Sequence, residues 1–211
     1  MIEVGTATGP ARVHVSAAED PLGSMLLTHG AGGGIGAADL AAIARALPEA
    51  GWTVALVEMP WRVAGKKLAP MPPKLDAAWR EIVPAVRDRL PGRLVMGGRS
   101  AGARVACRMA GELGADGVLC LSFPLVPPGK GPEKSRIGEL LMPLEAGLAV
   151  HVVQGAKDPF GGPDAVRDAL AGAAVLVDEA PGTHSFTGGA AVADLVTRRW
   201  SGWGAGAATP W

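Results

Sequence analysis

Short apolar runs alternate with longer amphipathic segments along most of this chain, and that alternation restricts the possible folds most strongly. The runs are rich in valine and leucine, and we predict strands at residues 2–5, 12–15, 25–28, 53–57, 93–97, 117–122, 149–153 and 174–177. The segments between them predict helices at residues 37–50, 75–90, 101–114, 137–145, 163–171 and 189–200. Strands joined by helices form a parallel sheet that is covered on both faces. We therefore predict an α/β fold with a mostly parallel sheet and helices on both faces.

The composition favours a single domain without a large charged partner surface. The chain has 211 residues, of which 48% are hydrophobic, and its 20 acidic residues balance its 20 basic ones. We predict one domain over residues 1–201, followed by a loose Gly/Ala-rich tail over residues 202–211. The charge balance argues against a protein devoted to nucleic-acid binding. No apolar run is long enough to cross a membrane and no secretory signal is visible, so we expect a cytoplasmic protein that binds neither nucleic acid nor membrane.

Cysteine and histidine usage argues against a metal site. Cys107 and Cys120 form no C-x-x-C pair, and they fall in a predicted helix and a predicted strand. We expect both to be small core residues in a reducing compartment. The four histidines are scattered without ligand spacing, so we predict neither a metal nor another cofactor.

A serine between two glycines follows one of the predicted strands. The segment Gly98-Arg99-Ser100-Ala101-Gly102 directly follows that strand and opens the next helix. A serine on such a turn has a strained backbone and an exposed hydroxyl, and the glycines avoid collisions with neighbouring strands. The pattern alone is weak in a chain with 31 glycines, but its position favours Ser100 as a nucleophile. The alternative is a glycine-rich turn without chemistry, and Arg99 is expected to make structural hydrogen bonds.

Two further reactive side chains follow other predicted strands. Asp158 comes just after the strand at 149–153, and His184 follows the strand at 174–177. Parallel sheets place their functional sites at the carboxyl ends of the strands. A serine hydroxyl becomes nucleophilic when an imidazole removes its proton, and a carboxylate must orient that imidazole. We therefore predict that Ser100, His184 and Asp158 form a catalytic triad.

Each member of this predicted triad has an alternative. Asp158 could only shape the turn before Pro159, and His184 could be a surface histidine. Other carboxylates and imidazoles compete for the roles: Asp164, Asp168, Asp178, His14 and His151. Asp164 and Asp168 lie in or beside a predicted helix, and Asp178 ends a predicted strand. His14 and His151 lie within predicted strands. Asp158 and His184 therefore remain the better candidates.

The loop His29-Gly-Ala-Gly-Gly-Gly34 follows the third predicted strand. A tetrahedral intermediate needs backbone N–H donors close to its oxyanion, and glycines allow that approach. We predict an oxyanion hole made by the amides of Ala31 and Ala101. Phosphate binding is the alternative, but no G-x-x-x-x-G-K-[ST] pattern is present. His29 itself is expected to be structural.

Two basic segments are expected to border the site. Only about fifteen residues separate the strand ending near Ser122 from the next helix, so a large lid is not expected. The candidate rim residues in these segments are Arg62, Lys66, Phe123 and Lys130. They could attract an anionic substrate or only form a solvated edge. A homo-oligomer is possible if Trp61, Trp203 or Trp211 is exposed.

Several segments in order along the chain resemble one known family. They are His29-Gly-Ala-Gly-Gly33, Gly97-Gly-Arg-Ser-Ala-Gly102, Phe123-Pro-Leu-Val-Pro-Pro-Gly-Lys130, Gln154-Gly-Ala-Lys-Asp-Pro-Phe-Gly161 and Gly182-Thr-His-Ser185. Together they resemble a small α/β-hydrolase family akin to dienelactone hydrolases, in the branch that includes a testis-expressed protein and a subunit of the NSL histone acetyltransferase complex. The resemblance implies an α/β-hydrolase fold with a minimal lid, and it implies nucleophile, acid and base roles for Ser100, Asp158 and His184. The chain departs from dienelactone hydrolases in having serine in place of cysteine, and Val126 stands where the family has histidine.

These observations lead to a functional hypothesis. We expect a serine hydrolase that cleaves a small carboxylic ester or thioester through an acyl-enzyme, with a small-molecule acyl substrate and no cofactor. The alternative is a non-catalytic interaction module that keeps the hydrolase scaffold. A cofactor-free peroxidase or acyltransferase built on the same triad is a third possibility.

Overall fold

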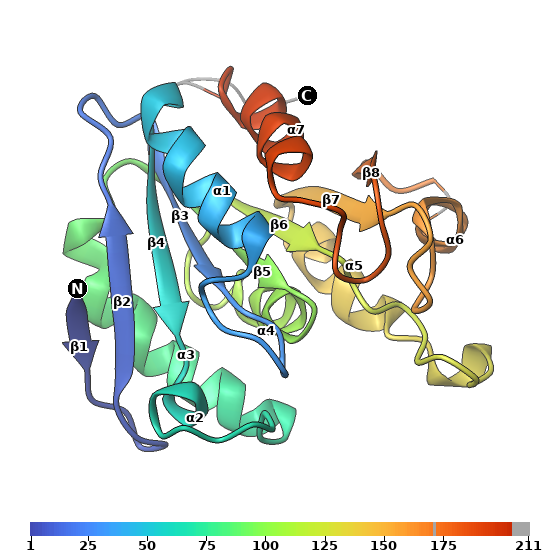
Figure 1. Cartoon of the computed structure of the whole chain (residues 1–211), viewed down its shortest axis with the longest axis horizontal. Coiled ribbons are helices and arrows are strands. Elements are labelled where there is room, and N and C mark those ends of the chain that lie inside the picture. Colours follow the sequence, from blue (N-terminus) through green and yellow to red (C-terminus); the bar gives the residue numbers. More distant parts are fainter. Residues whose placement is uncertain (171, 204–211) are drawn as a thin grey trace.

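The computed structural model describes residues 1–170 and 172–203, and within them eight strands form one sheet (Figure 1). The strands are β1 (Ile2–Val4), β2 (Ala11–Ser16), β3 (Gly23–Thr28), β4 (Trp52–Glu58), β5 (Arg93–Arg99), β6 (Gly117–Leu121), β7 (Ala149–Gly155) and β8 (Leu176–Ala180). Their order is β1-β2-β4-β3-β5-β6-β7-β8. The pairs β1–β2 and β2–β4 are antiparallel, and the pairs from β4 through β8 are parallel. The prediction of a mostly parallel sheet is confirmed.

Helices cover both faces of this sheet. They are α1 (Ala38–Ala46), α2 (Pro60–Val63), α3 (Pro72–Val86), α4 (Ala101–Met109), α5 (Ile137–Glu145), α6 (Pro163–Ala169) and α7 (Ala190–Trp200), with short 3-10 helices at Leu47–Ala50, Arg87–Arg89 and Pro132–Lys134. In Figure 1, α1 and α7 lie together on one face, while α3, α4 and α5 lie on the other. Each face of the sheet therefore has its own apolar core.

The predicted elements are all found, although some of their ends differ. β8 begins two residues later than predicted and extends to Ala180. The short helix α2 was not predicted, because its four residues are too few to show a helical period. Proline occupies the first turn of both α2 and α3, where its missing N–H costs nothing. Residue 171, at the predicted end of α6, lies outside the described residues.

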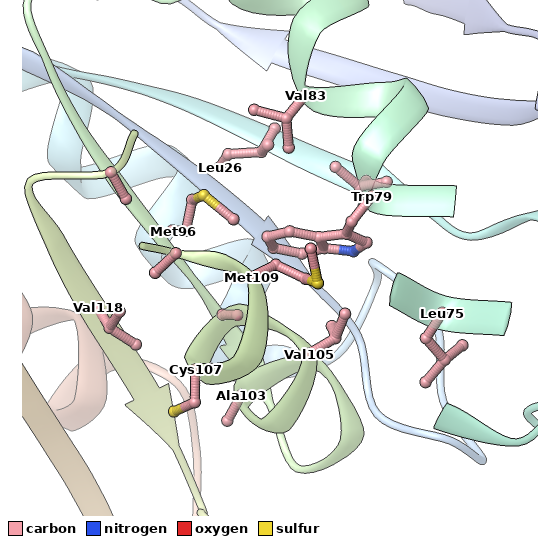
Figure 2. Packing of buried hydrophobic residues seen from close by; sticks show 14 of the residues in the cluster. Leu26, Leu75, Trp79, Val83, Met96, Ala103, Val105, Cys107, Met109 and Val118 are labelled. Carbon is pink, nitrogen blue, oxygen red and sulfur yellow. The ribbon is translucent and has the colours of Figure 1, made fainter. Parts of the chain in front are cut away.

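The larger of the two cores lies between the sheet and helices α3, α4 and α5. Its members include Trp79 of α3, Met96 of β5, Met109 of α4 and Leu26 of β3, which Figure 2 shows in the same part of the core. Burial of such large side chains supplies most of the free energy of folding. Cys107 and Cys120 are buried in the same core with their sulfurs 3.5 Å apart. Their predicted role as small core residues is confirmed.

The second core lies under α1 and α7, and it includes a tryptophan considered above as a contact residue if exposed. Trp203 is buried, and its ring stacks on Trp52 with centroids 6.3 Å apart. Trp61 is also buried, because its ring packs edge-on against the ring of His29. Neither side chain is an exposed contact surface. Trp211, and the part of the predicted tail from residue 204, lie outside the described residues.

The carboxyl ends of the parallel strands form the edge at which the predicted site residues lie. The segment between β6 and α5 spans only residues 122–136 and contains one short 3-10 helix. No lid domain is inserted there, so this edge is not roofed by a separate unit. Within the described residues, no helix is both long and apolar enough to cross a membrane.

Candidate active site

Ser100 lies on a sharp turn between β5 and α4. Its φ is 52° and its ψ is −107°, a backbone conformation that residues with side chains rarely adopt. The amide of Ser100 donates to the carbonyl of Leu121, at the end of β6, over 2.9 Å. That bond holds the turn against the sheet. The hydroxyl is therefore presented at the carboxyl edge, as predicted for a serine between two glycines on a strand-to-helix turn.

The glycines on either side of Ser100 are required by the close passage of β3. A Cβ at Gly98 would lie 2.3 Å from the carbonyl oxygen of Thr28, and a Cβ at Gly102 would lie 2.5 Å from the same atom. Gly98 also has a φ of 150°, which side chains disfavour. One backbone atom of β3 therefore explains both glycines of the pattern.

The structure brings Ser100, His184 and Asp158 together in one hydrogen-bonded line. The hydroxyl oxygen of Ser100 lies 2.9 Å from Nε2 of His184, and Nδ1 of His184 lies 2.8 Å from Oδ2 of Asp158. A carboxylate only accepts hydrogen bonds, so Nδ1 carries the proton and Nε2 is free to accept the proton of the hydroxyl. The side chain of Asp158 is fully buried, whereas 18% of the His184 side chain is exposed. The imidazole is thus partly accessible to solvent, whereas the carboxylate behind it is not.

Gln154 of β7 fixes the carboxylate of Asp158, and the sequence analysis assigned it no role. The two N–H groups on its Nε2 are shared among three acceptors, which are Oδ2 of Asp158 at 3.0 Å, the carbonyl of Gly161 and the carbonyl of Phe123. Its Oε1 accepts from the amide of Phe123. The chain's only glutamine is fully buried in β7, whose other residues are apolar except for His151. A lone buried amide four residues before the acid was the signal that could have revealed it.

The loop that carries His184 is held from two other sides. The guanidinium of Arg99 donates to the carbonyl of His184, and its Nε lies 3.0 Å from Oδ2 of Asp39 in an ion pair that is not aligned as a hydrogen bond. The ring of Phe160 lies against the imidazole with centroids 4.4 Å apart. The amide of Phe160 also donates to Oδ1 of Asp158. Arg99 therefore makes the structural contacts that were predicted for it.

The predicted oxyanion amides belong to two segments that meet at Ser100. Ala101 begins α4, and Ala31 lies in the loop after β3. A Cβ at Gly30 would lie 3.4 Å from Cβ of Ser100, so this loop passes directly beside the nucleophile. Within the described part of the chain, no hydrogen bond from either amide is found. Both N–H groups are therefore available as donors.

His29 is buried under this loop, in the structural role expected for it. Its Nε2 accepts from the amide of Met59 over 3.1 Å, and Nδ1 donates to the carbonyl of Gly30 over 2.9 Å. Burial lowers its pKa from the ordinary value of 6.5. A neutral imidazole that is held by two backbone hydrogen bonds is well suited to supporting this loop.

The four predicted rim residues do not form one surface. Arg62 lies beside the glycine loop, since a Cβ at Gly34 would come 3.8 Å from its guanidinium. Lys66 lines a pocket next to α2, and Lys130 is exposed in the segment before α5. The prediction for Phe123 is wrong, because its side chain is completely buried and Gln154 binds both its amide and its carbonyl.

The other carboxylates and histidines that were considered for the triad either pair with other residues or lie outside the hydrogen-bonded line of Ser100, His184 and Asp158. Asp178 binds His151 and Arg199 on the buried side of β8, and Asp164 pairs with Arg167. His14 lies in β2, which is separated from β5 by β4 and β3. Within the described residues no cluster of three metal-ligating side chains occurs. A hollow of about 230 Å³ lies between the start of α1 and the segment after His184, lined by Ala37, Ala38, Asp39, Arg99, Ser185, Phe186 and Gly188, and Ser100, Asp158 and His184 are not part of its lining.

Comparison with known proteins gives the same fold. A family model described as "Alpha/beta hydrolase domain" matches residues 22–192. An alpha-beta serine hydrolase homologue from Coxiella burnetii has a TM-score of 0.76 at 14% identity, with 93% of this chain and 95% of that chain covered. A serine hydrolase without a lid from Xanthomonas campestris has a TM-score of 0.72 at 20% identity, with 98% and 95% covered.

A third similar structure is the esterase domain of a Rhodothermus marinus protein. Its TM-score is 0.65 at 14% identity, and 96% of each chain is covered. No curated protein sequence matches the chain significantly. At such low identities the solved structures establish the fold, which is the α/β-hydrolase fold expected from the sequence.

Proposed function

This chain belongs to the alpha/beta hydrolase domain family, and from that membership we propose that it is a serine hydrolase cleaving a small carboxylic ester or thioester through an acyl-enzyme. One observation supports the proposal above all others. The hydroxyl of Ser100, both ring nitrogens of His184 and the buried carboxylate of Asp158 lie in one line with contacts of 2.9 Å and 2.8 Å. Such a line converts a weak hydroxyl nucleophile into an effective one.

In the first half of the reaction, Oγ of Ser100 attacks the carbonyl carbon of the substrate. Nε2 of His184 takes the hydroxyl proton and then gives it to the departing alkoxide or thiolate. The resulting imidazolium is stabilised by Asp158, whose two oxygens also accept from Gln154 and from the amide of Phe160. The products of this half are an acyl-serine and a free alcohol or thiol.

In the second half, His184 removes a proton from a water molecule, which attacks the acyl-serine. The carboxylic acid leaves and the proton returns to Oγ of Ser100. In both halves the negative oxygen would be stabilised by the amides of Ala31 and Ala101, and loss of one such donor typically lowers kcat by about 100- to 1000-fold.

The remaining proposals concern the substrate class, the cofactor and the location of the protein. Ester and thioester cleavage share the acyl-enzyme, so both remain within the proposed substrate class. We expect no cofactor, a small-molecule substrate and a cytoplasmic location. The esterase domain from Rhodothermus marinus and the two serine hydrolases resemble this chain in fold. An assembled Ser–His–Asp line weighs against the non-catalytic interaction module, because a scaffold has no need of it.

Labelling with a fluorophosphonate probe tests the proposed function. We expect the probe to modify Ser100 and to abolish hydrolysis of p-nitrophenyl acetate. Ser100→Ala should prevent labelling and lower kcat by about 1000-fold or more. Ser201→Ala changes an exposed serine beyond α7 and is the matched control. A parent protein that folds, resists the probe and hydrolyses no short ester or thioester would reject the proposal.

A further inference from the structure

A second pocket lies next to α2, and it has no part in the proposed mechanism. Its volume is about 480 Å³, within the range of small-molecule sites. It is bounded by the turn between β1 and β2, by α2 with the loop after it, and by the start of α3 (Figure 1). Its lining residues include Met59, Trp61, Ala64, Lys66, Lys74 and Leu75.

The charge of this pocket is entirely positive. Lys66 and Lys74 are its only charged lining residues, and no aspartate or glutamate lines it. In the part of the chain that the structure describes, neither lysine makes an ion pair. The nearby Glu81 of α3 accepts a hydrogen bond from the amide of Ala7. Two ammonium groups on one concavity whose lining holds no carboxylate favour an anionic ligand.

The rest of the lining is largely apolar. Met59, Trp61 and Leu75 are buried and form part of the wall. Leu68 is 83% exposed in the loop that borders the pocket. An apolar ligand in the pocket would cover this leucine, and burial of the two apolar surfaces would favour binding. The ligand therefore needs an apolar body as well as a negative charge.

Packed side chains separate this pocket from the nucleophile. The ring of Trp61 lies edge-on against His29 at 5.0 Å, and the amide of Met59 donates to the same imidazole. His29 precedes Gly30, which passes beside Ser100. Ser100, Asp158 and His184 are absent from the pocket lining. A ligand in the pocket would thus lie behind a wall rather than against the hydroxyl.

We propose that the pocket between α2 and α3 binds a small amphiphilic carboxylate, with its carboxylate at Lys66 and Lys74 and its apolar body along Met59, Trp61 and Leu75. The site is distinct from the Ser100 site. Acids of this type are what ester hydrolysis releases, so a role as a product-binding site rests on the proposed function. Binding itself does not rest on it.

Calorimetric titration of sodium octanoate into the full chain tests this site. Ser100→Ala protein is used, so that occupancy of the reactive serine plays no part. We expect octanoate to bind, and octan-1-ol and acetate to bind at least about tenfold more weakly, because each lacks one half of the recognised chemistry. The double variant Lys66→Met/Lys74→Met should weaken octanoate binding by about tenfold or more. Lys67→Met, whose lysine lies outside the pocket lining, is the matched control and should bind as the parent does.

Two further measurements locate the ligand. Ala64→Trp should fill the pocket and abolish binding, while protein labelled at Ser100 by a phosphonate should bind octanoate with unchanged affinity. Absence of octanoate binding, equal binding of octan-1-ol, or insensitivity to the lysine and Ala64 changes would overturn the proposal. Loss of binding on labelling would place octanoate at Ser100 and would overturn it as well. If the serine resists labelling, the proposed function fails while the titration still decides the pocket.

Discussion

At the scale of single residues, the site depends on backbone conformations that the surrounding structure must impose. A non-glycine residue with the φ of Ser100 typically costs on the order of 1–3 kcal/mol. The cost is offset by the bond from its amide to Leu121 and by the contact of both flanking glycines with Thr28. Gln154 has a comparable role for Asp158. Its side-chain amide links the carboxylate of Asp158 to the backbone of Phe123, which lies just after β6.

Gln154→Met should lower kcat by about 10- to 100-fold with little change in KM, because a displaced carboxylate misorients the imidazole without touching substrate. The free energy of unfolding should also fall, since the amide of Phe123 loses its acceptor. Val152→Ala, on the same strand, also lowers stability but leaves Asp158 untouched. Comparison of kcat and urea unfolding for both variants decides the matter: an equal loss of kcat in the two would show a merely structural role for Gln154.

At the scale of elements, charged pairs hold the helix that follows the nucleophile. Arg108 of α4 binds Asp76 of α3 over 2.6 Å and Glu139 of α5 over 3.0 Å. Arg104, one turn earlier on α4, binds the same Glu139 in a bidentate pair. These side chains are 13–21% exposed, so the pairs are less screened than surface pairs. They fix α4 between its two neighbours.

Arg108→Met should lower the free energy of unfolding by about 1–3 kcal/mol, because two carboxylates lose their half-buried partner. Arg80→Met is the matched control, since the Arg80–Glu112 pair joins α3 to the residues after α4 but is half exposed. Its effect should be clearly smaller. Urea denaturation of both variants measures the difference, and equal losses would show that burial of the Arg108 pairs contributes nothing.

At the scale of the whole molecule, the sequence predicted those features that depend on local patterns. Runs of valine and leucine located the strands, and the positions of Ser100, Asp158 and His184 after strands predicted that they would meet. Features that depend on neighbours distant in sequence were not predictable. The side chain of Phe123 is buried in the larger core by residues distant in sequence, and the pocket near α2 is formed by three separate segments. Neither the burial of Phe123 nor the pocket near α2 produces a pattern that can be recognised in the local sequence.

Two buried histidines make the stability of the whole fold sensitive to acid. In His151, Nδ1 accepts from the indole of Trp200, and Nε2 donates to Asp178. In His29, Nε2 accepts from the amide of Met59. If either imidazole took up a second proton, the new N–H would point at another N–H donor and would have no acceptor there. Burial lowers the pKa of both histidines from the ordinary value of 6.5.

The free energy of unfolding should therefore fall between about pH 7 and pH 5, because the unfolded chain binds protons that the folded chain cannot. The slope should approach roughly 1.4 kcal/mol per pH unit for each histidine. Burial acts to raise the pKa of Asp178, but hydrogen bonds from His151 and Arg199 outweigh it and lower that pKa, so acid costs stability again below about pH 4. His151→Gln keeps a donor and an acceptor but cannot charge, so it should remove part of the slope, and His29→Gln should remove another part. Urea titrations across this range measure the slopes, and an unchanged slope in both variants would contradict the assignment.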